Sequence, residues 1–395
     1  MRFNPFGADV RRDPYSVYRQ LREAPAHKVL GMWVLTRHAD VRAVMLDRSF
    51  SAGLIPQLIR RQADRHVRGA MGPIERLATK SLVFTDNPDH ARLRALVNRV
   101  FTAHAVAALR PAIAAVAEEL VENAHRHGGM DAIADLAAPL PLRVMCDWLA
   151  LPDGMRVQVG QWTHEIRFLL EPGLMTGDDL TRVRAAVEEF AQALAGEIAQ
   201  RRAHPREDLI SRLLAAETAG GDRLSDEEVT FVCIMCFVAG NETTQALIGN
   251  GLLALLRNPA QHLRLQARPD FAKGAVTETL RYDSPLQLTK RVATRDVDQI
   301  RAGDQVLLCL GAANRDPEVF ADPDRFDITR NPREHLAFGH GMHGCLGGAL
   351  AELQAQVALE TLYRRAKDLR LLTDQHQWQD HSLIVRGLKH LAVAL

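Results

Sequence analysis

Residues 338–347, FGHGMHGCLG, place one cysteine, Cys345, in a glycine-rich loop that leads into a predicted helix. The glycines permit unusual backbone conformations and let a flat ligand approach the main chain closely. Amides at the start of the following helix, from Leu346 onward, would face the sulfur and stabilise negative charge on it. A thiolate held in this way is a strong electron donor. We therefore interpret Cys345 as a metal-bound thiolate.

Two other interpretations of the loop are weaker. Residues 339–344 match GxGxxG, the pattern of a dinucleotide-binding turn. That turn follows a buried strand, whereas residues 331–335 are NPREH and no βαβ pattern surrounds them. A lone cysteine is also more often an inert core residue than a ligand. The full ten-residue pattern nevertheless favours a ligand, and the chemistry that needs such a donor is cleavage of an oxygen–oxygen bond at haem.

The composition excludes several classes of protein. The chain has 395 residues and no linker, charge block or repeat that would divide it, which predicts a single domain over residues 1–395. Its 49 Lys and Arg balance 48 Asp and Glu, so the net charge of +1 indicates neither nucleic acid nor an anionic membrane as a partner. The start of the chain has no apolar run typical of a signal or anchor. We expect a cytoplasmic protein without a membrane segment.

The five cysteines form no evident framework of disulfides in a chain without an export signal. Cys233 and Cys236 match CxxC, but the residues between them, Ile234 and Met235, are apolar and lie in a predicted helix. Core packing is therefore a better interpretation than a zinc site.

The pattern of apolar residues and breakers predicts a mainly α protein with a small β-sheet region, of the α+β class. Helices are expected over 15–22, from 40, and over 103–127, 178–202 and 208–217, and strands over 31–36, 291–295, 305–309 and 382–395.

The longest predicted helix spans residues 225–258. Ser225 and Glu228 form a capping box, and Pro259 closes the other end. At about 1.5 Å per residue this helix is about 50 Å long. Its first half is apolar on almost every side, which indicates burial in the centre of a large domain.

Polar residues interrupt that buried helix at 239–244, AGNETT. A threonine beside Gly240 can hydrogen-bond to an earlier carbonyl and open the helix locally, leaving room for dioxygen. Glu242 and Thr243 would then form an acid–alcohol relay that delivers protons. A bent structural helix is the alternative, and the thiolate candidate downstream favours the relay.

Several other charged residues are candidates for structural or cofactor-binding roles because of their spacing along the predicted helices and strands. Glu278 and Arg281 suit an ion pair on one helical face, and their burial would require a further basic side chain, expected from residues 323–326. His90 and Arg94 share a helical face, and with Arg291 and His343 they are candidates to bind the propionates of a haem.

Together these motifs resemble a cytochrome P-450 of the soluble bacterial type. The loop with Cys345, the segment 239–244 and the segment 278–281 correspond in order to the three best-known motifs of that family, and residues 89–94, 314–317 and 323–327 are similar to further family segments. The resemblance implies the P-450 fold, with haem b between the long central helix and the helix after Cys345.

The resemblance also implies a role for each motif. It makes Cys345 the axial ligand, Phe338 a shield for the sulfur, and Glu242 and Thr243 the residues that steer oxygen activation. Propionate or other cofactor contacts would come from His90, Arg94, Arg291, His343, Gly347 and Ala239, and Glu278 with Arg281 would be structural.

Two departures from the family pattern stand out. Residues 295–303 form a shorter connection than usual, with Arg301 where proline is common, so this hairpin is expected to be truncated. Gly344 stands where a bulkier residue is frequent, which would open the pocket beside the sulfur.

The implied function is a monooxygenase that inserts one oxygen atom of O2 into a hydrophobic small molecule, most simply by hydroxylation. Electrons would come from a separate ferredoxin or flavodoxin with its reductase, through a basic face for which Arg92, Arg99, His340 and Arg364 are candidates. A monomer is expected. Alternatives are a haem-thiolate peroxygenase or isomerase, which the Glu242–Thr243 pair disfavours, and a non-catalytic haem sensor or carrier.

The predicted substrate pocket is lined by apolar residues: Met235, Cys236 and Ala239 from the long helix, Leu286 and Leu288, and Leu169 or Leu170. A terpenoid, fatty acyl chain or polyketide of secondary metabolism would suit such a pocket. A helical core shows the same apolar stripe, so the sequence leaves the substrate open.

Overall fold

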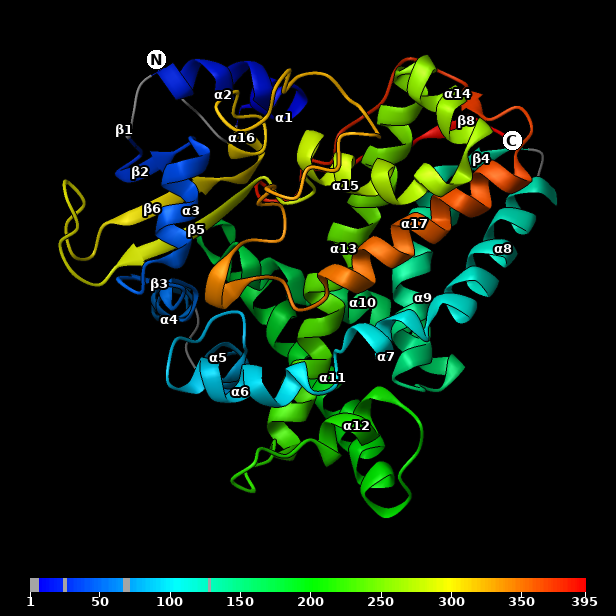
Figure 1. The fold of residues 1–395 in the computed structure, drawn as a ribbon. Coiled ribbons are helices and arrows are strands. Elements are labelled where there is room, and N and C mark those ends of the chain that lie inside the picture. The colour runs from blue at the N-terminus through cyan, green and yellow to red at the C-terminus, as the bar shows by residue number, and fades with distance from the viewer. Residues whose placement is uncertain (1–6, 24–26, 67–71, 127–128) are drawn as a thin grey trace. The chain divides into compact units, whose positions relative to one another are not determined.

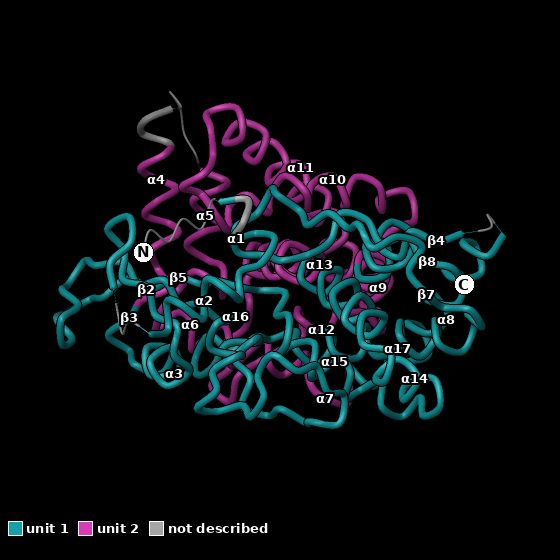
Figure 2. Tube along the Cα trace, turned by 90° about the horizontal axis from the view of Figure 1, so that it is seen from above, with its two compact units in different colours: residues 1–50, 106–141, 242–395 teal, residues 51–105, 142–241 magenta. Residues whose placement is uncertain are grey.

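The computed structural model describes residues 7–23, 27–66, 72–126 and 129–395, and helices dominate it (Figure 1). The described chain divides into two compact units (Figure 2). Unit 1 contains residues 1–50, 106–141 and 242–395, and unit 2 contains residues 51–105 and 142–241. The mainly α class with small sheets is confirmed, whereas the single domain over 1–395 stays a prediction.

A five-stranded sheet of order β1-β2-β6-β5-β3 belongs to unit 1, except for Ser51 at the end of β3. Its strands are β1 (His27–Val29), β2 (Met32–Leu35), β3 (Phe50–Ser51), β5 (Leu288–Ala293) and β6 (Gln305–Cys309). β2 pairs with β6 in parallel, and β6 pairs with β5 antiparallel, with Cys309 opposite Leu288. Since side chains alternate along a strand, Leu308 packs into one core cluster and Leu307 into another.

A second sheet of unit 1 joins β4 (Met130–Asp131), β8 (Ala392–Ala394) and β7 (Arg370–Leu371) in antiparallel pairs. The predicted strand over 382–395 is therefore wrong except for its last residues. Buried Gln379 instead ties residues 379–385 into a turn, because its side chain bonds the backbone there in place of a strand neighbour.

Helices fill the rest of unit 1. They are α1 (Ala8–Arg12), α2 (Pro14–Glu23), α3 (His38–Leu46), α8 (Arg110–Arg126), α14 (Pro259–Ala267), α15 (Ala272–Tyr282), α16 (Leu310–Ala313) and α17 (Gly348–Arg365), with the π-helix η1 (Ala132–Ala137) and the 3-10 turns η5 (Pro269–Phe271) and η6 (Gly341–His343). α17 packs against α8 and α15 (Figure 1).

Unit 2 is mainly helical over its described residues. It contains α4 (Leu54–His66), α5 (Gly72–Lys80), α6 (Asp89–Asn98), α10 (Arg156–Ile166), α11 (Gly177–Ala203) and α12 (Leu209–Ala215), with 3-10 turns η2 (Asp153–Met155), η3 (Arg167–Leu170) and η4 (Pro172–Leu174). α7 (Ala103–Ala107), α9 (Pro139–Trp148) and α13 (Asp226–Arg257) run from one unit into the other.

The helix predicted over 103–127 is interrupted. α7 ends at Ala107 and α8 begins at Arg110, with Pro111 in its first turn. Proline has no backbone N–H to continue a preceding helix but fits the first turn of a new one, which explains the break.

The long helix α13 begins as predicted. The backbone N–H of Ser225 donates to Glu228 Oε2 at 2.8 Å, and the N–H of Glu228 donates to Ser225 Oγ at 3.2 Å. Within the described residues α13 has the length and hydropathy of a membrane span, but 61% of its most apolar window is buried in the protein. It is a core helix, and Cys233 of the CxxC pair is fully buried in it.

Candidate active site

The glycine-rich loop turns tightly before α17. Gly339 and Gly341 have φ angles of +69° and +70°, in the left-handed region that side chains disfavour. The N–H of Cys345 donates to Phe338 O at 2.8 Å, and the N–H of Gly344 donates to Gly341 O at 3.1 Å. These bonds leave the side chain of Cys345 exposed. α17 begins at Gly348 rather than at the predicted Leu346.

Phe338 packs against the start of α17. A Cβ atom added to Gly348 would lie 3.3 Å from the Phe338 ring, so glycine at this position gives the ring its space. The His335 ring meets Phe338 edge-on, with 5.9 Å between ring centroids. Phe338 is thus held between a glycine and a histidine.

His335 is a feature that sequence reasoning missed. Burial, and then the charge of Arg281, lowers the pKa of this imidazole to about 4. Its Nδ1 is buried and has no hydrogen-bond partner among the described residues. The ring is therefore neutral at pH 7, and nothing in the local sequence distinguishes it from a surface histidine.

The polar segment of α13 lies where the helix passes from unit 2 into unit 1. Glu242 Oε1 in unit 1 lies 3.4 Å from Nε2 of His381, a residue of the C-terminal region. Thr243 is partly exposed, and Thr244 is buried. The preceding Asn241 has a buried Oδ1 that no described group bonds, an acceptor suited to a bound molecule or water.

The candidate propionate residues divide between the units. His90 and Arg94 lie on α6 of unit 2, where burial and then the charge of Arg94 lower the pKa of His90. Arg291 lies on β5 of unit 1 and donates to Lys290 O at 2.7 Å, while His343 lies in η6. His90 and Arg94 lie on one helix, as predicted, and their binding of propionates stays a prediction.

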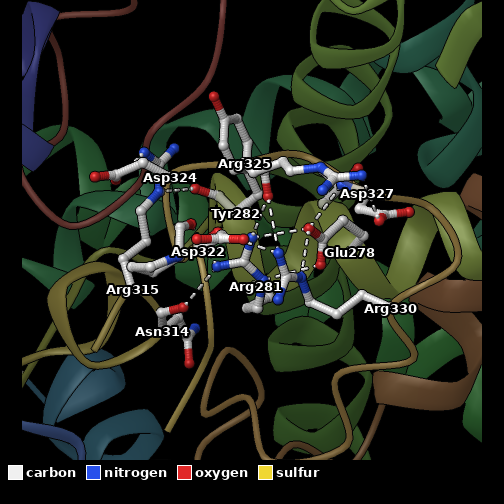
Figure 3. A network of polar contacts seen from close by, with 12 residues as sticks. Glu278, Arg281, Tyr282, Asn314, Arg315, Asp322, Asp324, Arg325, Asp327 and Arg330 are labelled. Atoms are coloured by element: carbon white, nitrogen blue, oxygen red, sulfur yellow. Dashed lines mark hydrogen bonds and ion pairs between the residues drawn. The ribbon is translucent and has the colours of Figure 1, made fainter. Parts of the chain in front are cut away.

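Glu278 and Arg281 form the centre of a buried network in unit 1 (Figure 3). Arg281 donates twice to Glu278, at 2.9 and 2.8 Å, and both side chains are 0% exposed. The remaining Arg281 donors bond the carbonyl oxygens of Asn314 at 3.2 Å, Pro323 at 2.8 Å and Arg325 at 3.1 Å.

The further basic partner of this network comes from a different residue than predicted. Arg330 Nε donates to Glu278 Oε1 at 3.2 Å, whereas residues 323–326 contribute backbone carbonyls (Figure 3). The prediction is wrong because the Arg325 side chain pairs with Asp327 at 3.3 Å, so that only its backbone carbonyl takes part in the network. The network holds α15 to the segment that leads to the cysteine loop.

The predicted pocket residues have different environments. On α13, Met235 is buried, Cys236 is half-buried and Ala239 is exposed. Leu286 is half-buried, and Leu288 is buried in the core beside Tyr18. Leu288 also lines a cavity of about 30 Å³ with Gln287 and Trp378. That volume suits a water molecule rather than a substrate.

Two of the candidate docking cations already have partners. Arg92 contacts Asp222 at 2.8 Å and Glu228 at 2.7 Å, which secures α6 to the start of α13 within unit 2. Arg364 contacts Glu118 at 2.6 Å. Arg99 is exposed and His340 is half-buried.

Comparisons with known proteins identify the family. A family model described as cytochrome P450 matches residues 166–270 and 270–367. The biotin biosynthesis cytochrome P450 of Bacillus subtilis (strain 168) is 37% identical, over 98% of this chain and 97% of that protein. The cytochrome P450 monooxygenase PikC of Streptomyces venezuelae is 36% identical, over 98% and 92%.

The crystal structure of P450BioI in complex with a hexadec-9Z-enoic acid ligated acyl carrier protein has a TM-score of 0.89 with this chain at 33% identity, covering 98% of this chain and 99% of that one. The chain belongs to the cytochrome P450 family. It is therefore a haem monooxygenase that binds iron protoporphyrin IX, acts on a hydrophobic substrate and receives electrons from a redox partner.

The residues of this P450 fit a haem. The described residues contain no group of three or more His, Cys, Asp or Glu that could hold a metal ion alone. A porphyrin brings its own nitrogen ligands and requires one strong donor from the protein, which an exposed cysteine can supply. The loop before α17 contains such a cysteine, and the glycines around it have no side chains that would cover the backbone.

Proposed function

We propose that Cys345 would hold the haem iron as a thiolate and that Glu242 and Thr243 would deliver protons for cleavage of O2 during hydroxylation of a hydrophobic substrate. The observation that carries the proposal is the exposed Cys345 side chain on a backbone fixed by its bond to Phe338 O. Bound haem supplies an iron at which dioxygen is reduced, and the thiolate provides electron density for that reduction.

The chain's own residues supply the rest of the chemistry. The Glu242 side chain is 22% exposed and lies 3.4 Å from His381, and Thr243 follows it on the same helix. A carboxylate that exchanges protons with water and a hydroxyl that passes them onward form a general-acid relay. Ala239 precedes the relay by less than one turn, so we assign it, with Gly347, to the cofactor contacts.

We assign the propionates to His90, Arg94, Arg291 and His343, and shielding of the sulfur to Phe338. Arginine binds a carboxylate with two parallel hydrogen bonds, so Arg94 and Arg291 would contribute most of this binding. Replacing either arginine by Leu should speed the transfer of haem from the holoenzyme to added apomyoglobin. Arg301→Leu, in an exposed turn, is the control and should leave the rate of haem transfer unchanged.

We further propose a fatty acyl or polyketide substrate. P450BioI was crystallised with an acyl-loaded carrier protein, and PksS of Bacillus subtilis (strain 168), 33% identical to this chain, is named a polyketide biosynthesis cytochrome P450. Met235, Cys236, Ala239, Leu286 and Leu288 would line the pocket. We assign the electrons to a ferredoxin or flavodoxin with its reductase, and the protein to the cytoplasm as a monomer.

The relay is tested by Thr243→Ala, with Thr244→Val as the matched control for loss of a neighbouring hydroxyl. With a surrogate ferredoxin system and a substrate found by its spin-state shift, Thr243→Ala should lower product formed per NADPH about tenfold or more, since a general acid contributes at least that much. Full turnover of Thr243→Ala with peroxide alone as oxidant would instead indicate a peroxygenase and overturn the proposal.

A further inference from the structure

One face of α13 contacts a segment from the C-terminal part of the chain. Glu242, Ala246 and Asn250 are four residues apart and therefore share a face of the helix. Residues 379–387, here called the C-terminal turn, follow that face. A Cβ atom added to Gly387 would lie 3.1 Å from the side chain of Ala246, and Asn250 Nδ2 donates to Arg386 O at 2.9 Å. At the end of the row, His381 meets Glu242 at 3.4 Å.

The C-terminal turn is fixed by hydrogen bonds to its backbone. Oε1 of buried Gln379 accepts from the N–H groups of His381 and Ser382, each at 3.0 Å, and its Nε2 donates to Val385 O. The N–H of Arg386 also donates to Pro285 O at 2.7 Å. His381 is consequently held in one place by a packed turn rather than by a surface loop.

The two side chains span the boundary between solvent and interior. The His381 side chain is 39% exposed and the Glu242 side chain 22% exposed. The charged neighbours on the turn are already paired: Asp380 with Lys389 at 3.0 Å, and Arg386 with Asp283 at 2.7 Å. Glu242 is the carboxylate that faces His381, and an imidazole has two ring nitrogens, so it can accept a proton at one and donate a proton from the other.

We propose that His381 is a positioning residue that holds the Glu242 carboxylate and passes protons to it from solvent. This inference rests on the proposed function of Glu242 and Thr243. A proton taken from water by the imidazole leaves from Nε2 to Glu242 Oε1, and Glu242 passes a proton on to Thr243. Reduction of O2 to peroxide consumes two electrons and two protons, and reduction to water consumes four of each, so slower proton delivery leaves more peroxide.

The contact itself is tested by NMR on the holoenzyme with labelled histidine, in the diamagnetic ferrous carbon monoxide form. Resonances of His381, assigned by their loss in His381→Gln, should shift in Glu242→Gln. His390, which pairs with Asp131 at 2.8 Å in the same C-terminal region, provides the control and should not shift. Unchanged His381 resonances in Glu242→Gln would overturn the inference.

The proton transfer is tested without a substrate, by oxidising NADPH through a surrogate ferredoxin and its reductase and measuring hydrogen peroxide per NADPH. His381→Gln keeps a hydrogen-bonding side chain but exchanges no protons. It should lower the share of electrons that reach water about tenfold and abolish the dependence of that share on pH. His390→Gln should behave like the wild type.

The variant Thr243→Ala shows whether a negative result refutes the role of His381 alone or the whole proton relay. If it raises the peroxide share while His381→Gln does not, or if the pH dependence persists in His381→Gln, the role of His381 is refuted and the relay stands. If neither variant raises peroxide, the proposed function of Glu242 and Thr243 fails together with the inference.

Discussion

Removing the guanidinium of Arg281 should strongly destabilise the fold of unit 1. The Glu278 carboxylate is 0% exposed, and in Arg281→Ala it would keep, among the described residues, the N–H of Asp327 at 3.0 Å and Arg330 at 3.2 Å as donors. The carbonyls of Asn314, Pro323 and Arg325 would each lose a charged donor (Figure 3). A buried carboxylate that loses its two-bond partner is costly, because water cannot replace the lost hydrogen bonds.

The expected loss is about 3–5 kcal/mol in the free energy of unfolding, the range for breaking one side of a buried ion pair. Proteins have only about 5–15 kcal/mol in total, so this loss is about a fifth or more of the stability. Arg281→Lys keeps the charge but cannot bond Glu278 with two parallel N–H groups, and it should lose a smaller part of the stability.

Urea unfolding of the holoenzyme, followed by the Soret band and by far-ultraviolet circular dichroism, measures the effect. Arg268→Ala is the matched control, because Arg268 makes the same two-bond contact with Asp270 but on the surface. The control should unfold like the wild type. If Arg281→Ala lies within about 1 kcal/mol of the wild type, the account of a buried, mutually dependent network is wrong.

Two further predictions concern pH and packing. The pKa of His335 is lowered to about 4, so its neutral form stabilises the fold above about pH 6.5 and this contribution is lost as pH falls toward 4. The free energy of unfolding, measured in urea, should fall over that range by up to about 3 kcal/mol, and less steeply in His335→Leu. Gly274→Ala should destabilise the protein by about 1–3 kcal/mol in thermal unfolding, since its Cβ would lie 2.2 Å from Ile328 O. Gly196→Ala, in an exposed helical position with nothing within 4 Å, should be neutral or stabilising.

Local signals in the sequence predicted the elements that depend on short-range chemistry. The Ser225–Glu228 capping box begins α13, and the apolar run over 305–309 forms β6 with the predicted bounds. Gly339 and Gly341 adopt the left-handed conformations expected of a tight loop around Cys345. In each case the residues that determine the structure lie within a few positions of one another.

Contacts between residues far apart in the chain could not be predicted from local sequence patterns. His381 lies far along the chain from Glu242, and no spacing rule connects an exposed histidine in a turn to a helix that distant. Arg330 was missed for the same reason, since the path of the chain after Arg325 decides which basic side chain reaches Glu278. The strand predicted at 382–395 failed because the apolar pattern does not reveal that Gln379 bonds the backbone of a turn.

The most direct test of the central claim is the carbon monoxide difference spectrum of the reduced protein. If Cys345 is a thiolate ligand, the wild type should show the strongly red-shifted Soret band of thiolate-ligated haem, and Cys345→Ser should lose it. Cys236→Ser, a partly buried thiol on α13, should retain it. An unshifted band in the wild type, or a red-shifted band that survives in Cys345→Ser, would contradict the account.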